Sequence, residues 1–211
     1  AYLTQIIPET TDSEFKWKEF QERINSDIIG NLGNFYNITF TFIKNKLGGE
    51  IRKPSESELD EYDRKLIKDL ERYNKKISQH LEDCEIRRSF SDLLALSSVG
   101  NKYFNDVEPW NEVKTNPERA SKRLYLCANL ARSLSILSAP YMPNISNEAW
   151  SQLNLLVSPS DNGIWDTASS VVLPDNHKIG EPKRLFKPIK DEDIERYKEV
   201  VAQGTELEDL F

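Results

Sequence analysis

Apolar residues that recur every three or four positions are the feature that most restricts the fold of this chain. Three successive segments keep this spacing, which predicts helices that each bury one face. The first begins at Ile24 and ends at Gly48-Gly49, the second follows Pro54, and the third spans about 85–104. The apolar stripes of the three segments are Ile24, Ile28, Leu32, Phe35, Phe42 and Leu47; Leu59, Tyr62, Leu66, Leu70, Tyr73, Ile77 and Leu81; and Phe90, Leu93, Leu94 and Tyr103.

The second half of the chain predicts three further helices. One begins at Asn116-Pro117, because Asn is a good helix cap and Pro is favoured at the first helical position. Its apolar residues, and the prolines that end it, are Leu124, Cys127, Leu130, Leu134, Leu137, Pro140 and Pro143. A short helix is expected near 146–153 and a last one near 191–203. Residues 157–190 are rich in Pro, Ser, Asp and Asn and predict a long loop with some extended structure.

These segments together predict an all-α chain. We expect a bundle of five or six helices with an irregular C-terminal loop region and a closing helix. The helical bundle should occupy residues 1–156, and residues 157–211 should supply the loop excursion, the closing helix and an acidic tail, packed on the same domain. Residues 205–211 are expected to be frayed. Gly30 and Gly33 lie inside the first long helix, which we attribute to close packing.

Composition restricts the class of protein. Hydrophobic residues make up 38% and charged residues 30% of the chain, as in a globular protein, and no apolar run approaches the ~18 residues that span a bilayer. The net charge is −7, but residues 191–211 hold eight acids and two bases. The remainder is therefore nearly neutral and can still carry a basic face. The first residue is Ala1, and Met142 is the one methionine, which suggests an excised fragment or a processed chain.

Catalytic and metal-binding patterns are missing from the sequence. His80 and His177 have no Cys or His at metal-ligand spacing, and neither do Cys84 and Cys127, which suggest a reducing, cytoplasmic compartment. Gly48-Gly49 is a helix stop and not a phosphate-binding loop. Acidic residues have Lys or Arg four positions away on helices, a pattern typical of solvated ion pairs. We therefore expect no catalysis, no metal and no cofactor in this chain.

A binding function remains, and some residues are of the types that RNA-binding proteins use. RNA-binding proteins stack exposed aromatic rings on bases and contact base edges with amides. Asn34 and Ile38 are one helical turn apart and share a face. Trp110 follows Pro109, just outside the third helix. Its ring is well placed to stand in solvent, but periodicity alone favours a core or cap aromatic. The candidate binding residues are Asn34, Ile38, Asn101, Tyr103, Pro109 and Trp110.

Several segments resemble methionyl-tRNA synthetases, and together they cover most of the chain. The most specific are Asn101-Lys102-Tyr103 and Glu108-Pro109-Trp110. The other matching segments are 8–20, 23–37, 134–143 and 180–186. Residues 1–20 resemble the junction between the catalytic domain of that family and its helical anticodon-binding domain. Leucyl-, isoleucyl-, valyl- and cysteinyl-tRNA synthetases have related bundles but match these motifs less well.

This resemblance implies roles for individual residues. Trp110 would stack on the first anticodon base, a cytosine, and Asn34 would contact the anticodon. Ile38 stands where the family usually has an Arg that hydrogen-bonds this cytosine. Because Ile cannot donate a hydrogen bond, either another residue reads the base or this protein relies more on stacking.

The resemblance also implies partners. We expect methionine tRNAs with a CAU anticodon and the catalytic domain of the same polypeptide, but neither DNA nor a membrane. The H-x-G-H and K-M-S-K-S type signatures of the family are absent from this sequence. Aminoacylation, with its ATP, methionine and Mg, would therefore belong to another part of the parent enzyme. The alternatives are the anticodon-binding domain of another class I synthetase and a helical protein-interaction module.

Overall fold

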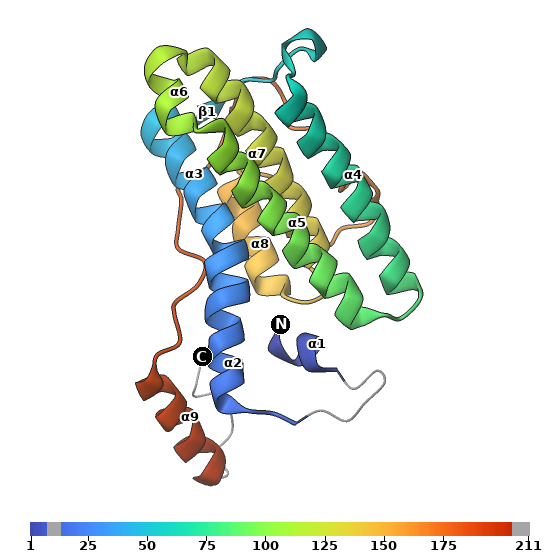
Figure 1. Cartoon of the computed structure of the whole chain (residues 1–211), viewed down its shortest axis with the longest axis vertical. Coiled ribbons are helices and arrows are strands. Elements are labelled where there is room, and N and C mark those ends of the chain that lie inside the picture. Colours follow the sequence, from blue (N-terminus) through green and yellow to red (C-terminus); the bar gives the residue numbers. More distant parts are fainter. Residues whose placement is uncertain (8–13, 204–211) are drawn as a thin grey trace.

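Helices dominate the computed structural model, which describes residues 1–7 and 14–203 (Figure 1). The expected all-α class and helix bundle are thereby confirmed. The helices are α1 (Tyr2–Ile6), α2 (Trp17–Arg23), the π-helix η1 (Ile24–Gly33), α3 (Asn34–Leu47), the 3-10 turn η2 (Glu56–Glu58), α4 (Glu61–Glu82), α5 (Ile86–Val107), α6 (Pro109–Thr115), α7 (Pro117–Ser138), α8 (Pro143–Gln152), the 3-10 turn η3 (Trp165–Thr167) and α9 (Asp191–Gln203). Two short strands, β1 (Glu50–Ile51) and β2 (His177–Lys178), pair antiparallel.

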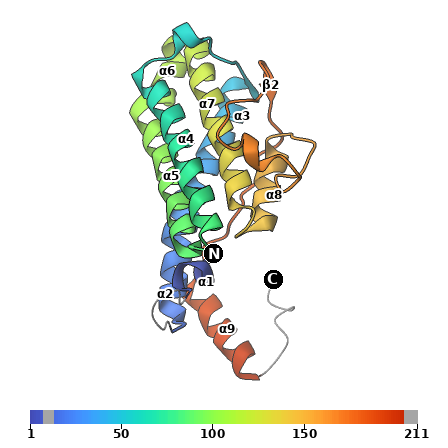
Figure 2. The same ribbon diagram turned by 90° about the vertical axis from the view of Figure 1, so that its right-hand side faces the viewer.

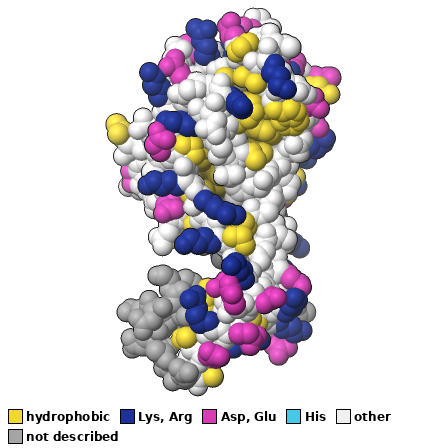
Figure 3. Space-filling view, turned by 90° about the vertical axis from the view of Figure 1, so that its left-hand side faces the viewer, with side chains coloured by type: hydrophobic (Ala, Val, Ile, Leu, Met, Phe, Trp, Pro, Cys, Tyr) yellow, Lys and Arg dark blue, Asp and Glu magenta, His cyan; other side chains and the backbone are white. Residues whose placement is uncertain are grey.

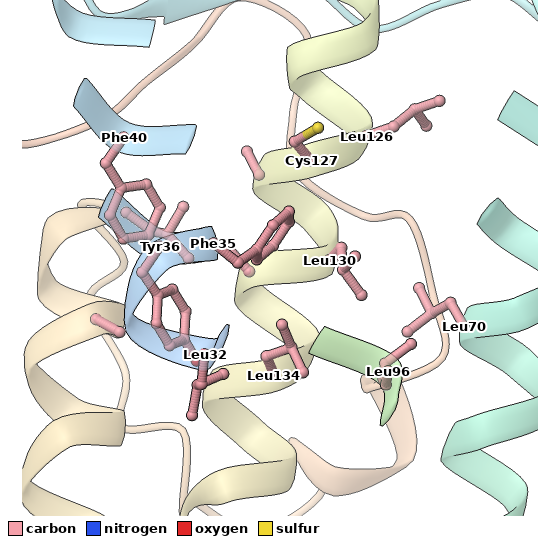
Figure 4. Close-up of a cluster of buried hydrophobic side chains, with 14 of the residues drawn as sticks. Leu32, Phe35, Tyr36, Phe40, Leu70, Leu96, Leu126, Cys127, Leu130 and Leu134 are labelled. Atoms are coloured by element: carbon pink, nitrogen blue, oxygen red, sulfur yellow. The ribbon is translucent and has the colours of Figure 1, made fainter. Parts of the chain in front are cut away.

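Helix α7 is the centre of the bundle. Every residue from Leu124 to Ser138 is buried, so this helix is covered on all sides and not along one stripe only. Large side chains from α3, α4 and α5 surround it, among them Phe35, Leu70 and Leu96 (Figure 4). Its buried Ser133 and Ser135 are satisfied within the helix, since each donates to a carbonyl one turn earlier.

The α4–α5 hairpin covers another side of α7, as the amphipathic pattern predicts. Helix α4 begins with a capping box, in which the Asp60 carboxylate accepts from the backbone N–H of Tyr62 and Asp63. It ends before Cys84, whose φ of 58° reverses the chain into α5. Figure 2 shows the two helices side by side along the bundle.

The first long helix differs from the prediction of one regular α-helix from Ile24 to Gly48. Helix α2 already begins at Trp17, and ten residues, Ile24–Gly33, form a π-helix before α3 continues. Ile24, Ile28 and Leu32 are spaced by four residues, which is compatible with an α-helical turn and also with the wider π-helical turn, so the apolar pattern does not separate the two here. Gly48 ends α3 in the left-handed conformation (φ 66°), as predicted.

Residues 153–190 form the irregular excursion that the composition predicts. The buried amide of Asn129 anchors it, because its Oδ1 accepts from the backbone N–H of Val172 and Leu173 at 2.8 and 3.0 Å. His177, predicted in a loop, lies in β2 with its Nε2 2.7 Å from the carbonyl of Leu153. The strand pair thus joins this excursion to the end of α3.

A hydrogen-bonded clamp returns the chain to its beginning. The side chain of Asn25 binds the backbone of Ile189 on both sides, with Nδ2 2.8 Å from its carbonyl and Oδ1 2.9 Å from its N–H. Gln21 Nε2 adds bonds of 3.1 Å to Ile189 and 2.9 Å to Asp191. These contacts place α9 beside α2 (Figure 1).

Two further points complete the fold. Pro143, expected to end the preceding helix, instead occupies the first position of α8. The predicted frayed tail at 205–211 lies outside the described residues. None of the helices in the described ranges combines the length and the apolarity that a membrane span requires.

Candidate nucleic-acid interface

A row of amide side chains joins the π-helix and α3 to α5. Asn101 on α5 donates to the carbonyl and the side-chain oxygen of Asn31, at 3.0 and 3.1 Å. Asn34 donates to Oδ1 of Asn101 at 2.8 Å. Asn31 in turn donates to the carbonyl of Leu94 and to Ser98 Oγ. The candidates Asn34 and Asn101 are therefore in direct contact, and the exposed amide of Asn34 is held in one orientation.

Ile38 lies one turn beyond Asn34 on α3, as the spacing requires. Its side chain is half-buried and packs against the hydrophobic core. Asn34 is exposed and Ile38 is not, so the two residues share a side of the helix but differ in access to solvent. The sequence alone did not show this difference.

Trp110 occupies the first turn of α6 and not a loop beyond a helix, which corrects the expectation. Glu108 adopts a left-handed conformation (φ 44°) that ends α5, and Pro109 restarts a helix at once with its ring buried. The indole is 38% exposed, and its other side rests on Phe104, with 6.0 Å between the ring centroids. Phe42 supports Phe104 from α3 in an edge-to-face contact. The ring is thus fixed from below and open on one side.

Tyr103 points away from this open ring. Its side chain is 5% exposed, and its hydroxyl donates to Asp63 Oδ1 at 2.5 Å. Burial raises the pKa of Tyr103 well above its usual value, so the hydroxyl remains a donor. In this arrangement Tyr103 connects α5 to α4, and the structure does not bring it to the surface that holds Asn34 and Trp110.

Asp63 belongs to a buried cluster of charges between α4 and α7. Its Oδ2 lies 2.6 Å from Arg119, and Asp60 accepts from both Arg119 and Arg123 at 2.9 Å. The Asp63 side chain is 1% exposed, so the prediction that the acids form solvated surface pairs is wrong here. Among the residues that the structure describes, no group of acids, histidines and cysteines has the geometry of a metal site.

A groove next to Asn34 brings in residues that the sequence did not single out. It runs between the π-helix and the extended segment 183–186 and encloses about 150 Å³. Asn34 and Asn37 line one wall, and Lys183 and Arg184 line the other. The sequence predicts only a loop region at 157–190. The fold shows that Lys183 and Arg184 of this region share a groove with the amides of α3.

Comparison with known protein families identifies the relationship. The family described as the anticodon-binding domain of methionyl-tRNA ligase matches residues 53–206, more than half of the chain. This chain is an anticodon-binding domain of the methionyl-tRNA synthetase family. A second description, class I tRNA synthetases of the methionyl type, matches residues 1–40. The resemblance that the motifs indicate is confirmed.

Curated methionine–tRNA ligases from distant organisms match nearly the whole chain. The enzyme of Christiangramia forsetii is 36% identical over 199 residues, which cover 92% of this chain and 28% of the relative. The enzyme of Methanobrevibacter smithii is 35% identical and covers 96% and 30%, and that of Pyrococcus abyssi is 32% identical and covers 92% and 26%. The chain thus spans between a quarter and a third of the length of these methionyl-tRNA synthetases.

Solved structures show the same fold. The apo form of Mycobacterium tuberculosis methionyl-tRNA synthetase superposes with a TM-score of 0.80 at 20% sequence identity. The superposition covers 90% of this chain and 38% of that enzyme. The same enzyme with methionyl-adenylate gives a TM-score of 0.78. The helical arrangement is therefore shared at an identity too low to carry residue roles.

Proposed function

We propose that this methionyl-tRNA synthetase domain binds the CAU anticodon of methionine tRNAs. Binding would position the tRNA so that its acceptor end reaches a catalytic domain of the same polypeptide. ATP, methionine and Mg would act in that catalytic domain, because the catalytic signatures of the family are absent from this sequence. The family match and the exposed site on α3, α5 and α6 support this proposal.

The observation that carries the proposal is the open face of Trp110. Aromatic rings that bind single-stranded RNA must present a free face while the rest of the side chain is fixed. Trp110 meets this condition, since Phe104 supports one side of an indole that is 38% exposed. Asn101 lies about one turn before Phe104 on α5, and it holds the amide of Asn34 on α3 at 2.8 Å, so the amides would contact the nucleotide next to the stacked base.

Replacement of the indole tests the proposal directly. Base–aromatic stacking contributes about 1–3 kcal/mol per base, so Trp110→Ala should weaken binding of a CAU anticodon stem-loop RNA about 5- to 150-fold. Trp110→Phe should retain part of the affinity, because it keeps a ring. Tyr62→Ala is the matched control, since Tyr62 is an aromatic residue of similar exposure (45%) on α4.

The RNA itself supplies the second half of the test. An abasic site in place of the anticodon cytosine should weaken binding to the unmodified domain and have little further effect on Trp110→Ala. Equal affinities of Trp110→Ala and the unmodified domain, with unchanged helix content, would contradict the stacking role. Loss of helix content would instead identify Trp110 as a structural aromatic.

A further inference from the structure

We infer that the groove between the π-helix and residues 183–186 holds the phosphate backbone of the same RNA strand whose base stacks on Trp110. This inference rests on the proposed function and adds a second, base-independent contact to it. The residues that would make this contact are Lys183 and Arg184 on the extended segment and Asn37 on α3.

The walls of the groove are fixed before any ligand arrives. On the segment side, the backbone N–H of Lys183 donates to Gln152 Oε1 at 2.8 Å. Phe186 packs directly on Gly33, where an added Cβ would lie 2.8 Å from its ring. On the other side the wall is the π-helix itself, a rare element that is frequent at functional sites. A rigid groove loses little conformational entropy when it binds a ligand.

The charges of the groove distinguish it from most of the surface. Lys183, Arg184 and the neighbouring Lys187 are exposed, and none of them forms an ion pair with a described residue. None of the described acids lines the groove. The nearby Glu181 is already paired with Lys44. Positive charge is therefore concentrated and uncompensated here, although the whole chain carries −7.

Lysine and arginine elsewhere are mostly neutralised. The basic side chains on α7 are an example, because Arg119, Lys122 and Arg123 each contact two acids. Lys and Arg side chains without an acidic partner, next to amide donors, are suited to bind a phosphodiester group. Figure 3 shows Lys and Arg side chains following one another down this face, below an apolar patch.

The groove is continuous with the stacking site. Asn34 lines the groove and also donates to Asn101, one turn before Phe104 and its contact with Trp110. Between Asn34 and Phe42, the other aromatic of that cluster, α3 rises by about 12 Å. A few nucleotides of an extended strand would therefore span from the indole to Arg184.

The test measures how RNA affinity depends on salt. Each phosphate contact with a single strand contributes about 0.7 to the slope of log affinity against log salt concentration. The full 211-residue chain with Lys183→Ala and Arg184→Ala should show a slope smaller by about 0.7–1.4 for the CAU stem-loop. The matched control is Lys68→Ala with Lys75→Ala, which removes two exposed, unpaired lysines from α4 on the other side of the bundle.

A single uncharged methylphosphonate, moved along the stem-loop, locates the contact. At one position it should weaken binding to the unmodified chain and leave binding to the double variant unchanged. A slope for the double variant equal to that of the α4 control would overturn the groove contact while Trp110→Ala still tests the stacking. A chain that binds no stem-loop RNA at all would overturn both proposals.

Discussion

Two clusters of polar side chains, on opposite sides of α5, are organised in opposite ways. Between α4 and α7, the charges of Asp60, Asp63, Arg119 and Arg123 are paired with one another and largely covered. On the other side, the amides of Asn34 on α3 and Asn101 on α5 hold each other in place, and in the adjoining groove Lys183 and Arg184 form no ion pair with a described residue. In the first arrangement each of these four charges already has a protein partner.

The difference shows which polar groups are available for function. A buried pair has already exchanged its water for a protein partner, so a ligand would have to displace that partner. An exposed Lys or Arg without an acidic partner has kept most of its hydrating water, and it can still form a charge-assisted hydrogen bond with a ligand. Net charge did not reveal this, because both clusters contribute to the same −7.

Removing a charge from the covered cluster should have the largest effect on stability. Asp63→Ala removes the acceptor of the Tyr103 hydroxyl and one of the two carboxylates that contact Arg119, and we expect a loss of about 3–5 kcal/mol in the free energy of unfolding. Urea unfolding measures it. Asp106→Ala, which removes an exposed partner of Lys102, is the control and should cost less than about 1 kcal/mol. Similar losses for both variants would show that the covered cluster stabilises the chain no more than an exposed ion pair does.

A cut in the amide row should affect stability and binding together. Asn101→Ala removes donors to Asn31 and Ser97 and the acceptor of Asn34, and we expect a loss of about 1–3 kcal/mol in unfolding free energy. RNA affinity should also fall, because Asn34 is no longer oriented. Asn105→Ala, on the exposed surface of α5 one turn later, should change neither quantity. A stability loss without a loss of affinity would make the row purely structural.

The substitution Ile38→Arg probes the boundary between the hydrophobic core and the exposed amides of α3. Because Ile38 is half-buried, loss of its packing should cost about 1 kcal/mol, while the longer side chain keeps its charge in solvent. The guanidinium should increase affinity more for the CAU stem-loop than for one with the cytosine replaced. Equal gains for both RNAs would indicate a phosphate contact. Destabilisation by several kcal/mol would assign Ile38 to the core and contradict a role in binding.

The smallest effect concerns pH and an exposed ion pair at the rim of the covered cluster. The hydrogen bond from Lys122 lowers the pKa of Glu58 from 4.5 to about 2. The stabilisation that this gives is present above pH 4.5 and is lost as the pH falls towards 2. Glu58→Gln should therefore flatten the decline of stability in that window and change little at pH 7. An unchanged acid limb in the unfolding curves would contradict this assignment.

Local sequence rules anticipated the helices but not all of their geometry. The stripe from Leu59 to Leu81 predicted α4 because its apolar and charged faces are cleanly separated. The π-helix escaped prediction because the apolar spacing continues through it into α3, and the residue that packs on its Gly33, Phe186, is remote in sequence. The restart at Pro109 was missed because a left-handed Glu108 is needed to reverse the chain in so few residues.

The candidate site was predicted in part. Resemblance to a family pointed to Asn34, Asn101 and Trp110, and the structure places them on neighbouring helices. The burial of Tyr103 followed from a contact with Asp63 forty residues away, which no local pattern encodes. Lys183 and Arg184 were not predicted as site residues for a similar reason. Whether a Lys or Arg side chain has an acidic partner depends on which acids the fold brings near it.

The clamp of Asn25 and Gln21 on Ile189 has a mechanical consequence. A pulling force applied between α2 and α9 loads four hydrogen bonds in parallel before it reaches the bundle, since the clamp joins segments 164 or more residues apart. Displacement of either segment would thus be transmitted to the other through the clamp. Because α2 continues without a break into the π-helix and α3, the same displacement would also reach Asn31 and Asn34.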